Sequence, residues 1–350
     1  MPSGSGRRGR VLILSLGGTI AMTKDGGGDE AEGVRPTLGA EDLVAAVPEI
    51  ADEADIETEA FERLPGAHLG VDHILALAER IERAVADGVD GIVVTQGTDT
   101  IEETAFLLDL LLTLEQPVVI TGAMRNPTLP GADGPANLLA ATQVAASATA
   151  RGLGALVVFN DELHAARYVR KTHTSSLATF ESVPGPLGWV SEGRPRVLVR
   201  PTRRIELPAR PKGSEAPVAL LTISIEDDGR MLRAVPGLDY KGVVVEALGG
   251  AHVPEPVADA VEALSAEMPV VLTSRTGRGE VLTETYDFPG SERDLIARGA
   301  IPAGWLDGPK ARALLIVLLR AGLGRDEIGA MFEAIAADPE SAGAGGKPGS

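Results

Sequence analysis

Short, wholly apolar runs alternate along the chain with longer segments of helical periodicity. The runs are rich in Val, Ile and Leu, and they predict buried strands at residues 11–16, 91–95, 118–121, 155–159, 218–224, 243–247 and 270–274. Continuous apolar runs, unlike alternating ones, are typical of strands that are covered on both faces. The pattern therefore favours parallel sheets with helices packed against each side.

Helical periodicity fills the segments between these strands. Residues 72–87 place apolar side chains three and four positions apart, with Asp72 available to cap the start and Gly88 to end the helix. Residues 101–114 and 135–150 predict further helices. This alternation of strand and helix predicts an α/β fold class, with two α/β domains built on mainly parallel sheets.

A polar stretch with four prolines divides the chain at residues 201–217. We expect a flexible leader at 1–9, a larger N-terminal catalytic domain at 10–200, a linker at 201–217, a smaller C-terminal domain at 218–337 and a disordered tail at 338–350. The smaller domain ends in a strongly apolar helix near 309–321 and a further helix near 326–336.

Composition narrows the classes of function. The 350 residues include no cysteine, which excludes a disulfide scaffold and a thiolate site, and the net charge of −18 disfavours nucleic acid and anionic membranes as partners. The apolar run at 11–16 is too short for a signal peptide, so we expect a cytoplasmic protein without a membrane anchor. The five histidines show no zinc-like spacing, and we expect no metal and no cofactor.

Polar side chains gather where the predicted strands end, which is where open α/β sheets place their reactive groups. Thr19 follows the glycines Gly17 and Gly18, which permit close backbone approach to a ligand. Thr98 and Asp99 follow the second predicted strand. Residues 122–135 form a third polar cluster, and Asn160, Asp161 and Lys171 follow a fourth strand.

Each cluster also has a purely structural interpretation. Thr19 can cap a helix, and Asp99 or Thr100 can do so with Glu103 reaching back. In the third cluster Arg125 can pair with Asp133, and Lys171 can be an ordinary solvated side chain. Residue spacing alone leaves these alternatives open.

Several motifs together resemble the bacterial L-asparaginase family. They are Leu16–Ala21, Gln96–Thr104, Gly122–Arg125 with Ala132–Pro135, Asn160–Asp161 through Lys171, and Ser274–Gly277, in that order. The resemblance extends from residue 11 to residue 336. It implies hydrolysis of the side-chain amide of L-asparagine to L-aspartate and ammonia, with L-glutamine as a further candidate substrate. It also implies a homotetramer built from intimate dimers, for which the apolar run at 314–319 offers a packing surface.

Matching the motifs residue by residue assigns roles. Thr19 resembles the family's nucleophilic threonine, and Thr98, Asp99 and Lys171 resemble its second triad. In that triad a lysine held out of water can act as a base, and Thr98 holds the attacking water or relays the proton. Asp99 also binds the α-ammonium group of the substrate. The substrate loop of the family matches Gly66, Ala67 and His68.

The chain departs from the family pattern at three of these places. Gly66 replaces a serine that would hold the substrate's α-carboxylate, and Gln96 replaces the usual histidine. The segment after Thr19 has no tyrosine to activate it, and Tyr286 is a candidate substitute. These departures leave two alternatives to an asparaginase: an amidohydrolase for another amide, such as a D-amino acid or peptide derivative, and a non-catalytic regulator that binds asparagine or aspartate.

Overall fold

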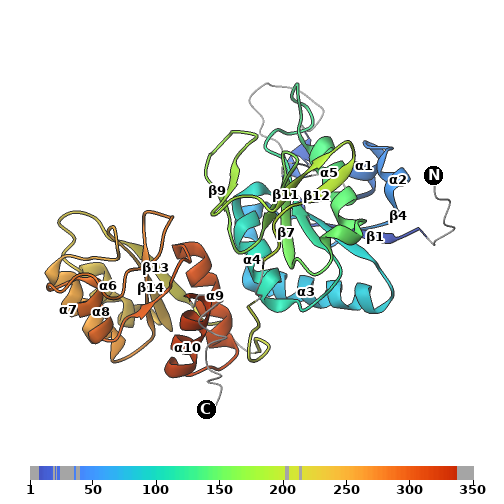
Figure 1. Ribbon diagram of the computed structural model, residues 1–350. Helices are drawn as coiled ribbons and strands as arrows, with labels where there is room; N and C mark the ends of the chain where they lie inside the picture. The colour runs from blue at the N-terminus through green and yellow to red at the C-terminus, as the bar shows by residue number, and fades with distance from the viewer. Residues whose placement is uncertain are drawn as a thin grey trace, which may run out of the picture. The chain divides into compact units, whose positions relative to one another are not determined.

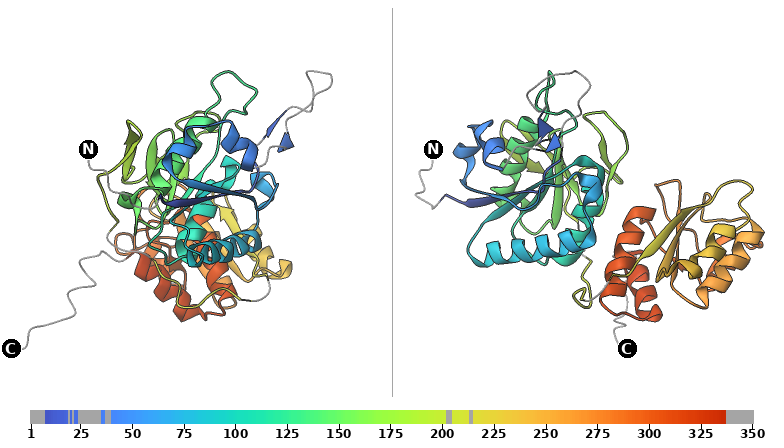
Figure 2. Two further views of the ribbon diagram at one scale, coloured as in Figure 1. Left: turned by 90° about the vertical axis from the view of Figure 1, so that its right-hand side faces the viewer. Right: turned by 180° about the vertical axis from the view of Figure 1, so that it is seen from behind.

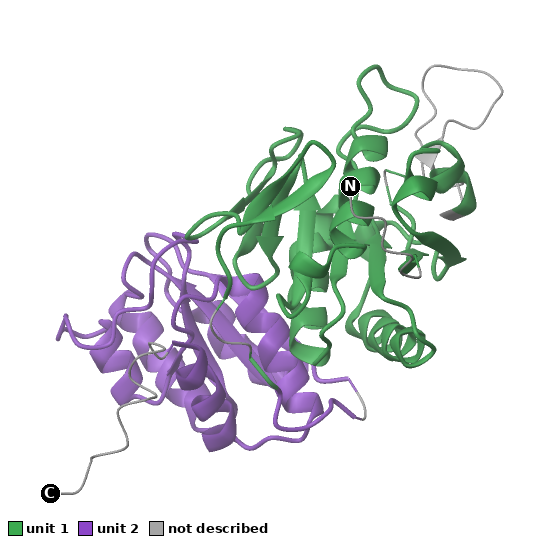
Figure 3. Cartoon of the chain, turned by 45° about the vertical axis from the view of Figure 1, so that its right-hand side comes forward, with its two compact units in different colours: residues 1–206 green, residues 207–350 purple. Residues whose placement is uncertain are grey.

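The computed structural model describes residues 8–18, 20, 22–23, 35–36, 40–201, 205–212 and 215–336. They form two compact units that divide between Glu206 and Leu207, inside the expected linker (Figure 3). The domain boundaries themselves stay a prediction. Residues 1–7 of the expected leader and the whole expected tail at 338–350 lie outside the described residues.

An eight-stranded sheet forms the centre of the first unit (Figure 1), in the order β12-β11-β8-β7-β6-β5-β1-β4. The strands are β1 (Arg10–Ser15), β4 (Asp55–Ala60), β5 (Gly91–Thr95), β6 (Val118–Thr121), β7 (Ala155–Phe159), β8 (Glu162–Ala165), β11 (Gly188–Ser191) and β12 (Arg194–Val197). The five strands from β7 to β4 are parallel, and β8, β11 and β12 extend the sheet antiparallel.

Helices cover both faces of this sheet (Figure 2). They are α1 (Ala40–Ala45), α2 (Ile50–Glu53) and α5 (Gly134–Ala145) on one face, and α3 (Val71–Ala86) and α4 (Ile101–Leu111) on the other; short 3₁₀ turns lie at η2 (Gly66–His68), η3 (Thr98–Thr100) and η4 (Ala148–Ala150). Successive side chains of β1 point to opposite faces, so Val11 and Ile13 pack in the core with α1, α2 and α5. Leu12 and Leu14 are buried as well. The predicted α/β class with helices on both faces is confirmed.

The predicted helices occur with shifted ends. Helix α3 begins at Val71 with Gly70 as its N-cap residue, so the prediction that Asp72 caps it is wrong, because Asp72 lies inside the first turn. At the other end Gly88 has φ +86° and its amide donates to the carbonyl of Val85 at 3.0 Å, which confirms a glycine stop. Helix α4 ends at Leu111, earlier than expected, and α5 gives way to η4.

The sequence pattern missed the strands that are only half buried. Strand β4 alternates exposed and partly buried residues and carries three acidic side chains, so no apolar run marks it. Strands β11 and β12 also carry exposed residues, whereas β8 is a short strand that is buried after its first residue, Glu162. The pattern likewise missed two small antiparallel ribbons, β2 (Met22–Thr23) with β3 (Arg35–Pro36) and β9 (Val169–Lys171) with β10 (Phe180–Ser182). The second of these ribbons carries Lys171.

The second unit has a four-stranded parallel sheet, β13 (Val218–Thr222), β14 (Gly242–Ala247), β15 (Val270–Ser274) and β16 (Ile301–Pro302). Its helices are α6 (Arg230–Ala234), α7 (Glu255–Ser265), α8 (Glu292–Ala297), α9 (Gly308–Arg320) and α10 (Arg325–Ala336), with a 3₁₀ turn η5 (Val235–Leu238). Helix α9 packs on β13 and β14, and Leu314, Leu315 and Leu318 are fully buried. The apolar run at 314–319 is therefore buried within this chain. It does not offer the surface for packing between subunits that we expected of it.

The order of the parallel strands places a crevice between β1 and β5. From β1 the chain adds β4 on one side and then returns to add β5, β6 and β7 on the other. The connections that leave β1 and β5 consequently diverge, which opens a crevice beyond the carboxyl ends of these two strands. The segments that contain Gly17, Gly18 and Thr98 begin at those ends.

His164 predicts an acid sensitivity of this fold. Its side chain is 1% exposed in β8 and contacts the Ser182 hydroxyl at 2.9 Å, and burial lowers the pKa of His164 from 6.5 to about 4. Glu162 lies 3.4 Å from Nε2 but is half exposed. Between pH 6.5 and 4 this histidine is protonated in the unfolded chain but neutral in the folded chain. As the pH is lowered through this range, the free energy of unfolding therefore decreases by about 1.4 kcal/mol per pH unit.

We therefore expect the free energy of unfolding, measured by urea titration, to drop by about 3 kcal/mol from this group between pH 6.5 and 4. His164→Gln should flatten that part of the pH profile, although it weakens the fold at pH 7. His68→Gln is the matched control, because His68 is exposed. A profile equally steep in wild type and His164→Gln would contradict the assignment.

Candidate active site

Three loops meet backbone to backbone at the crevice. Gly18 follows β1 with φ +85°, and a Cβ there would lie 2.0 Å from the amide nitrogen of Gly97, which follows β5. A Cβ on Gly97 would lie 3.0 Å from the nitrogen of Gly66, in the loop after β4. These distances leave no room for a side chain at Gly18. The close approach to a ligand that we expected of this glycine stays a prediction.

Gly17 makes a similar contact with the loop after β4. It has φ +99°, and a Cβ would lie 2.8 Å from the carbonyl oxygen of Leu64. The Leu64 amide in turn donates to Leu16 at 2.9 Å. Thr19 is the next residue after Gly18, but it lies outside the described residues, and its role stays a prediction.

Thr98 and Asp99 lie on the 3₁₀ turn η3, between β5 and α4. Thr98 is buried at 6% exposure, whereas the Asp99 side chain is 70% exposed. Thr100 is the N-cap residue of α4, as one structural interpretation expected, but its side chain makes no capping hydrogen bond. The Thr100 hydroxyl instead donates to the Gly66 carbonyl at 3.0 Å and accepts from Gln96 Nε2 at 3.3 Å.

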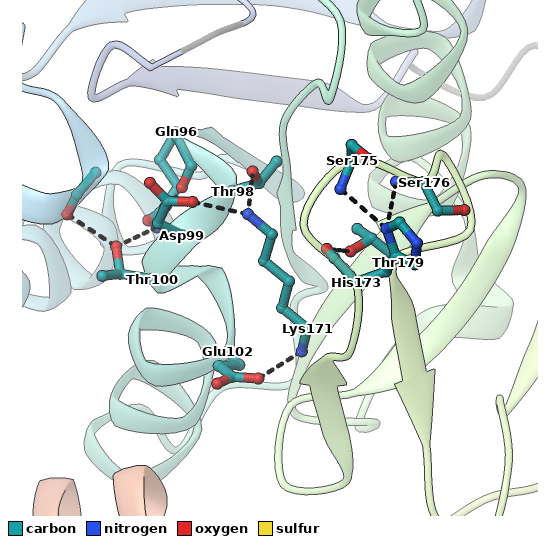
Figure 4. A network of polar contacts seen from close by, with 12 residues as sticks. Gln96, Thr98, Asp99, Thr100, Glu102, Lys171, His173, Ser175, Ser176 and Thr179 are labelled. Carbon is teal, nitrogen blue, oxygen red and sulfur yellow. Dashed lines mark hydrogen bonds and ion pairs between the residues drawn. The ribbon is translucent and has the colours of Figure 1, made fainter.

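Lys171 reaches this turn from the end of β9 (Figure 4). Its Nζ donates to Thr98 Oγ1 at 3.0 Å and to Asp99 Oδ1 at 2.7 Å. The side chain is only 15% exposed. Lys171 is thus directed into the site and is not a solvated surface lysine. The three residues that the resemblance groups together are in contact although Thr98 and Lys171 are 73 positions apart.

A tight turn closes the ribbon behind Lys171. The ring of His173 accepts the backbone amides of Ser175 and Ser176 at 3.0 and 2.9 Å through Nδ1, and the Thr179 hydroxyl donates to the His173 carbonyl (Figure 4). Two amides on Nδ1 require the ring proton to sit on Nε2. Sequence reasoning missed this turn, although His173 directly follows Thr172 and Lys171 in a run of small polar residues.

The candidate substrate loop lies beside Thr98 because Gly66 packs on Gly97. Gly66 is buried at the start of η2, and Ala67 and His68 are exposed. The Thr100 hydroxyl bonds this loop to the turn that carries Thr98. The structure therefore brings the predicted substrate-binding and catalytic segments together.

The third strand-end cluster is structural. Asp133 accepts the amides of Met124 and Arg125 at 2.9 and 2.8 Å, so the expected pairing with Arg125 occurs through its backbone instead of its guanidinium. Asn137 donates to Gly122 at 3.0 Å and accepts the amide of Asn160 at 2.9 Å, which ties two strand-end loops to α5. Sequence reasoning missed Asn137 because it lies within an otherwise apolar helix.

Tyr286 belongs to the second unit. Its ring is 45% exposed and lies edge-on to His252 with a centroid distance of 4.9 Å. Its amide donates to Glu292 Oε1 at 2.6 Å. The accessory role suggested for Tyr286 stays a prediction.

Within the part of the chain that the structure describes, no group of three or more His, Asp or Glu side chains is arranged to hold a metal ion. None of the described helices has the length and hydrophobicity needed to cross a membrane.

Two family models match the chain in succession. "Asparaginase, N-terminal" matches residues 10–203 and "Glutaminase/Asparaginase C-terminal domain" matches residues 217–332. The chain belongs to the L-asparaginase/glutaminase family. The family and the fold class predicted from the sequence motifs are therefore confirmed.

Individual members of this asparaginase family match nearly the whole chain. An L-asparaginase of Bacillus licheniformis is 36% identical over 89% of this chain and 95% of its own length. A probable L-asparaginase of Deinococcus radiodurans is 38% identical over 92% and 97%. The crystal structure of a probable cytoplasmic L-asparaginase from Campylobacter jejuni superposes with a TM-score of 0.81 at 32% identity, covering 93% of this chain and 99% of that one.

Gly66 allows a test of how this chain holds a substrate carboxylate. Restoring the family's serine adds a hydroxyl worth roughly 1.5–3 kcal/mol, or about ten- to a hundred-fold in KM for L-asparagine. Its Cβ, however, would lie 3.0 Å from the Gly97 carbonyl oxygen, next to Thr98. Gly66→Ser alone therefore mixes two effects.

Gly66→Ala separates these effects, because it adds the Cβ without the hydroxyl. We expect Gly66→Ala to lower kcat, and Gly66→Ser to have a KM about tenfold or more below that of Gly66→Ala. Steady-state kinetics of the two folded variants provides the comparison. Equal KM values would mean that backbone donors or His68 already hold the carboxylate.

Proposed function

We propose that this chain hydrolyses the side-chain amide of L-asparagine to L-aspartate and ammonia, with Thr19 as nucleophile and Thr98, Asp99 and Lys171 as the second catalytic group. Its family membership makes the chain an L-asparaginase, which is a kind of amidohydrolase. The observation that carries the assignment of roles is the contact of Lys171 Nζ with Thr98 Oγ1 and Asp99 Oδ1, in the crevice that begins at Gly18.

In the first half of the reaction the Thr19 hydroxyl attacks the amide carbon. A bond forms between Oγ and carbon, the carbon–nitrogen bond breaks, and the nitrogen leaves as ammonia after it receives the hydroxyl proton. The product is a β-aspartyl ester on Thr19. Backbone amides beside Gly97 and Thr98 are suited to stabilise the oxyanion, since three chain segments converge there with no side chain between them.

In the second half water attacks that ester. Thr98 Oγ1 is buried and 3.0 Å from Lys171 Nζ, so it can orient a water and pass a proton when the amine is uncharged. The bond between Thr19 and the acyl carbon then breaks, which returns the hydroxyl and releases aspartate. The neighbouring Asp99 keeps Lys171 pointed at Thr98 through its 2.7 Å contact.

L-Glutamine is a second substrate to test, since the matching C-terminal family model covers glutaminases and asparaginases. A specific observation also favours a different amide. The Gly66-Ala67-His68 loop lacks the hydroxyl that the family motif supplies, which points to a substrate without a free α-carboxylate, such as a peptide derivative.

We further propose a homotetramer of intimate dimers and a cytoplasmic location. The first rests on the family resemblance alone. The second is supported by the word "cytoplasmic" in the name of the Campylobacter jejuni structure.

Ammonia release with a panel of amides tests the function directly. We expect turnover of L-asparagine to exceed that of L-glutamine, D-asparagine and a β-aspartyl peptide. Release from the peptide or the D-amino acid alone would replace the proposal by the alternative amidohydrolase. Binding of L-asparagine without release of ammonia, seen by calorimetry, would indicate the regulator instead.

The assignment of the nucleophile needs a different measurement, because residues that act as a unit give non-additive losses in overall rate. We expect Thr19→Val to abolish the acyl-enzyme, and Thr98→Val to form it and hydrolyse it slowly. Intact-mass measurement after rapid quenching with a slow substrate detects the adduct. An adduct on Thr98 that still forms in Thr19→Val would exclude Thr19 as nucleophile.

A further inference from the structure

Lys171 is held at both of its ends by one short segment. Its Nζ contacts Thr98 and Asp99, and its backbone amide donates to Glu102 Oε2 at 2.5 Å (Figure 4). All three partners lie within residues 98–102, across η3 and the first turn of α4. The nucleophile motif and the family resemblance assign no role to Glu102.

The contacts of the ammonium group do not by themselves fix this lysine. A lysine side chain has four rotatable bonds and therefore much rotamer entropy, which a point-like ammonium group does little to restrain. Asp99 is 70% exposed, so its ion pair with Lys171 is screened by water. A well-defined distance from Nζ to Thr98 therefore requires a fixed backbone at Lys171.

The backbone at Lys171 needs support from outside its own ribbon. Strands β9 and β10 form a separate two-stranded sheet, and an isolated pair of this kind is only marginally stable. On the β10 side, Phe180 is paired with Lys171 in the ribbon, and its ring packs on the ring of Phe159 with a centroid distance of 5.0 Å. On the β9 side, the bond to Glu102 joins Lys171 to the helix whose preceding turn carries Thr98.

Glu102 also lies in the first turn of α4, where a carboxylate stabilises the helix dipole. Glu103 lies in the same turn and supplies the same charge there. The acceptor of the Lys171 backbone amide is Glu102, and the acceptors of its Nζ are Thr98 and Asp99. Substitutions at these two glutamates therefore separate two effects: the loss of a negative charge from the first turn of α4, and the loss of the hydrogen bond to the Lys171 amide.

We infer that Glu102 is a positioning residue for the reaction: as acceptor of the Lys171 amide, it sets the distance between the lysine Nζ and the Thr98 hydroxyl. This inference rests on the proposed function, because it assumes that Lys171 and Thr98 act together on the substrate. A carboxamide can replace the carboxylate in this task, because its carbonyl oxygen also accepts a hydrogen bond.

The test compares four variants with wild type. Glu102→Ala should lower kcat for L-asparagine about 10- to 100-fold with little change in KM, since a small misplacement of a catalytic group has effects of that size. Glu102→Gln should stay within about threefold of wild type, because a neutral acceptor keeps the bond in weaker form. Glu103→Gln removes the same charge from the same turn and should leave kcat unchanged.

The fourth variant covers the case in which Glu102→Ala does not fold. Glu102→Asp keeps the charge but is one methylene shorter, so it should lower kcat in a folded protein. Equal losses in Glu102→Gln and Glu102→Ala would show that charge matters and would overturn the inference. Full kcat in folded Glu102→Ala or in Glu102→Asp would overturn it as well.

A readout without turnover distinguishes failure of this inference from failure of the proposed function. Acetylation of lysines by a water-soluble active ester, followed by peptide mass mapping, reports how freely Lys171 Nζ reacts. We expect faster labelling of Lys171 in Glu102→Ala than in wild type and Glu102→Gln, with the other lysines as internal reference. Unchanged labelling would overturn the inference, whereas a wild type that releases no ammonia would overturn only the proposed function.

Discussion

The candidate site depends on the direct packing of backbone on backbone at Gly18, Gly97 and Gly66. Because a Cβ at Gly18 would lie 2.0 Å from the Gly97 nitrogen, the loops after β1 and β5 can meet only if the first of them has no side chain. That contact removes the space that a side chain would fill and brings the backbones of three loops together. The crevice itself follows from the strand order, but its tightness follows from these glycines.

This packing also joins the candidate substrate loop to the turn that carries Thr98. Gly66 belongs to the candidate substrate loop, and its carbonyl accepts the Thr100 hydroxyl on the turn that carries Thr98. Gln96, where the family has a histidine, holds Thr100 from the other side at 3.3 Å. The candidate substrate loop and Thr98 are therefore joined through the side chain of Thr100. The loss of the family's serine at Gly66 and the change at Gln96 affect one continuous set of contacts, not two separate parts of the site.

The sequence predicted the parts of the fold that are apolar and local. Strands such as β5 and β7 are buried on both faces, so a run of aliphatic residues marks them. Strands β4, β11 and β12 were missed because exposed positions interrupt the apolar signal. The ribbon that delivers Lys171 was missed because each of its strands has only three residues. The glycines at 17 and 18 were interpreted as room for a ligand, and the sequence did not indicate that Gly18 packs on the backbone of Gly97. The bond from Glu102 to the Lys171 amide could not be predicted, because a backbone amide has no sequence signature.

Asp99 has two roles at the proposed site: it contacts Lys171, and it is proposed to bind the α-ammonium group of the substrate. Its Oδ1 holds Lys171 at 2.7 Å, and among the described residues no second partner contacts Oδ2. With 70% of the side chain exposed, that second oxygen can receive the α-ammonium group of an amino acid without breaking the first contact. The contact that orients Lys171 toward Thr98 and the contact proposed for the substrate therefore use different oxygens of one carboxylate. Because the two oxygens belong to one rigid group, a substrate held at Oδ2 is placed at a fixed position relative to Lys171 and Thr98.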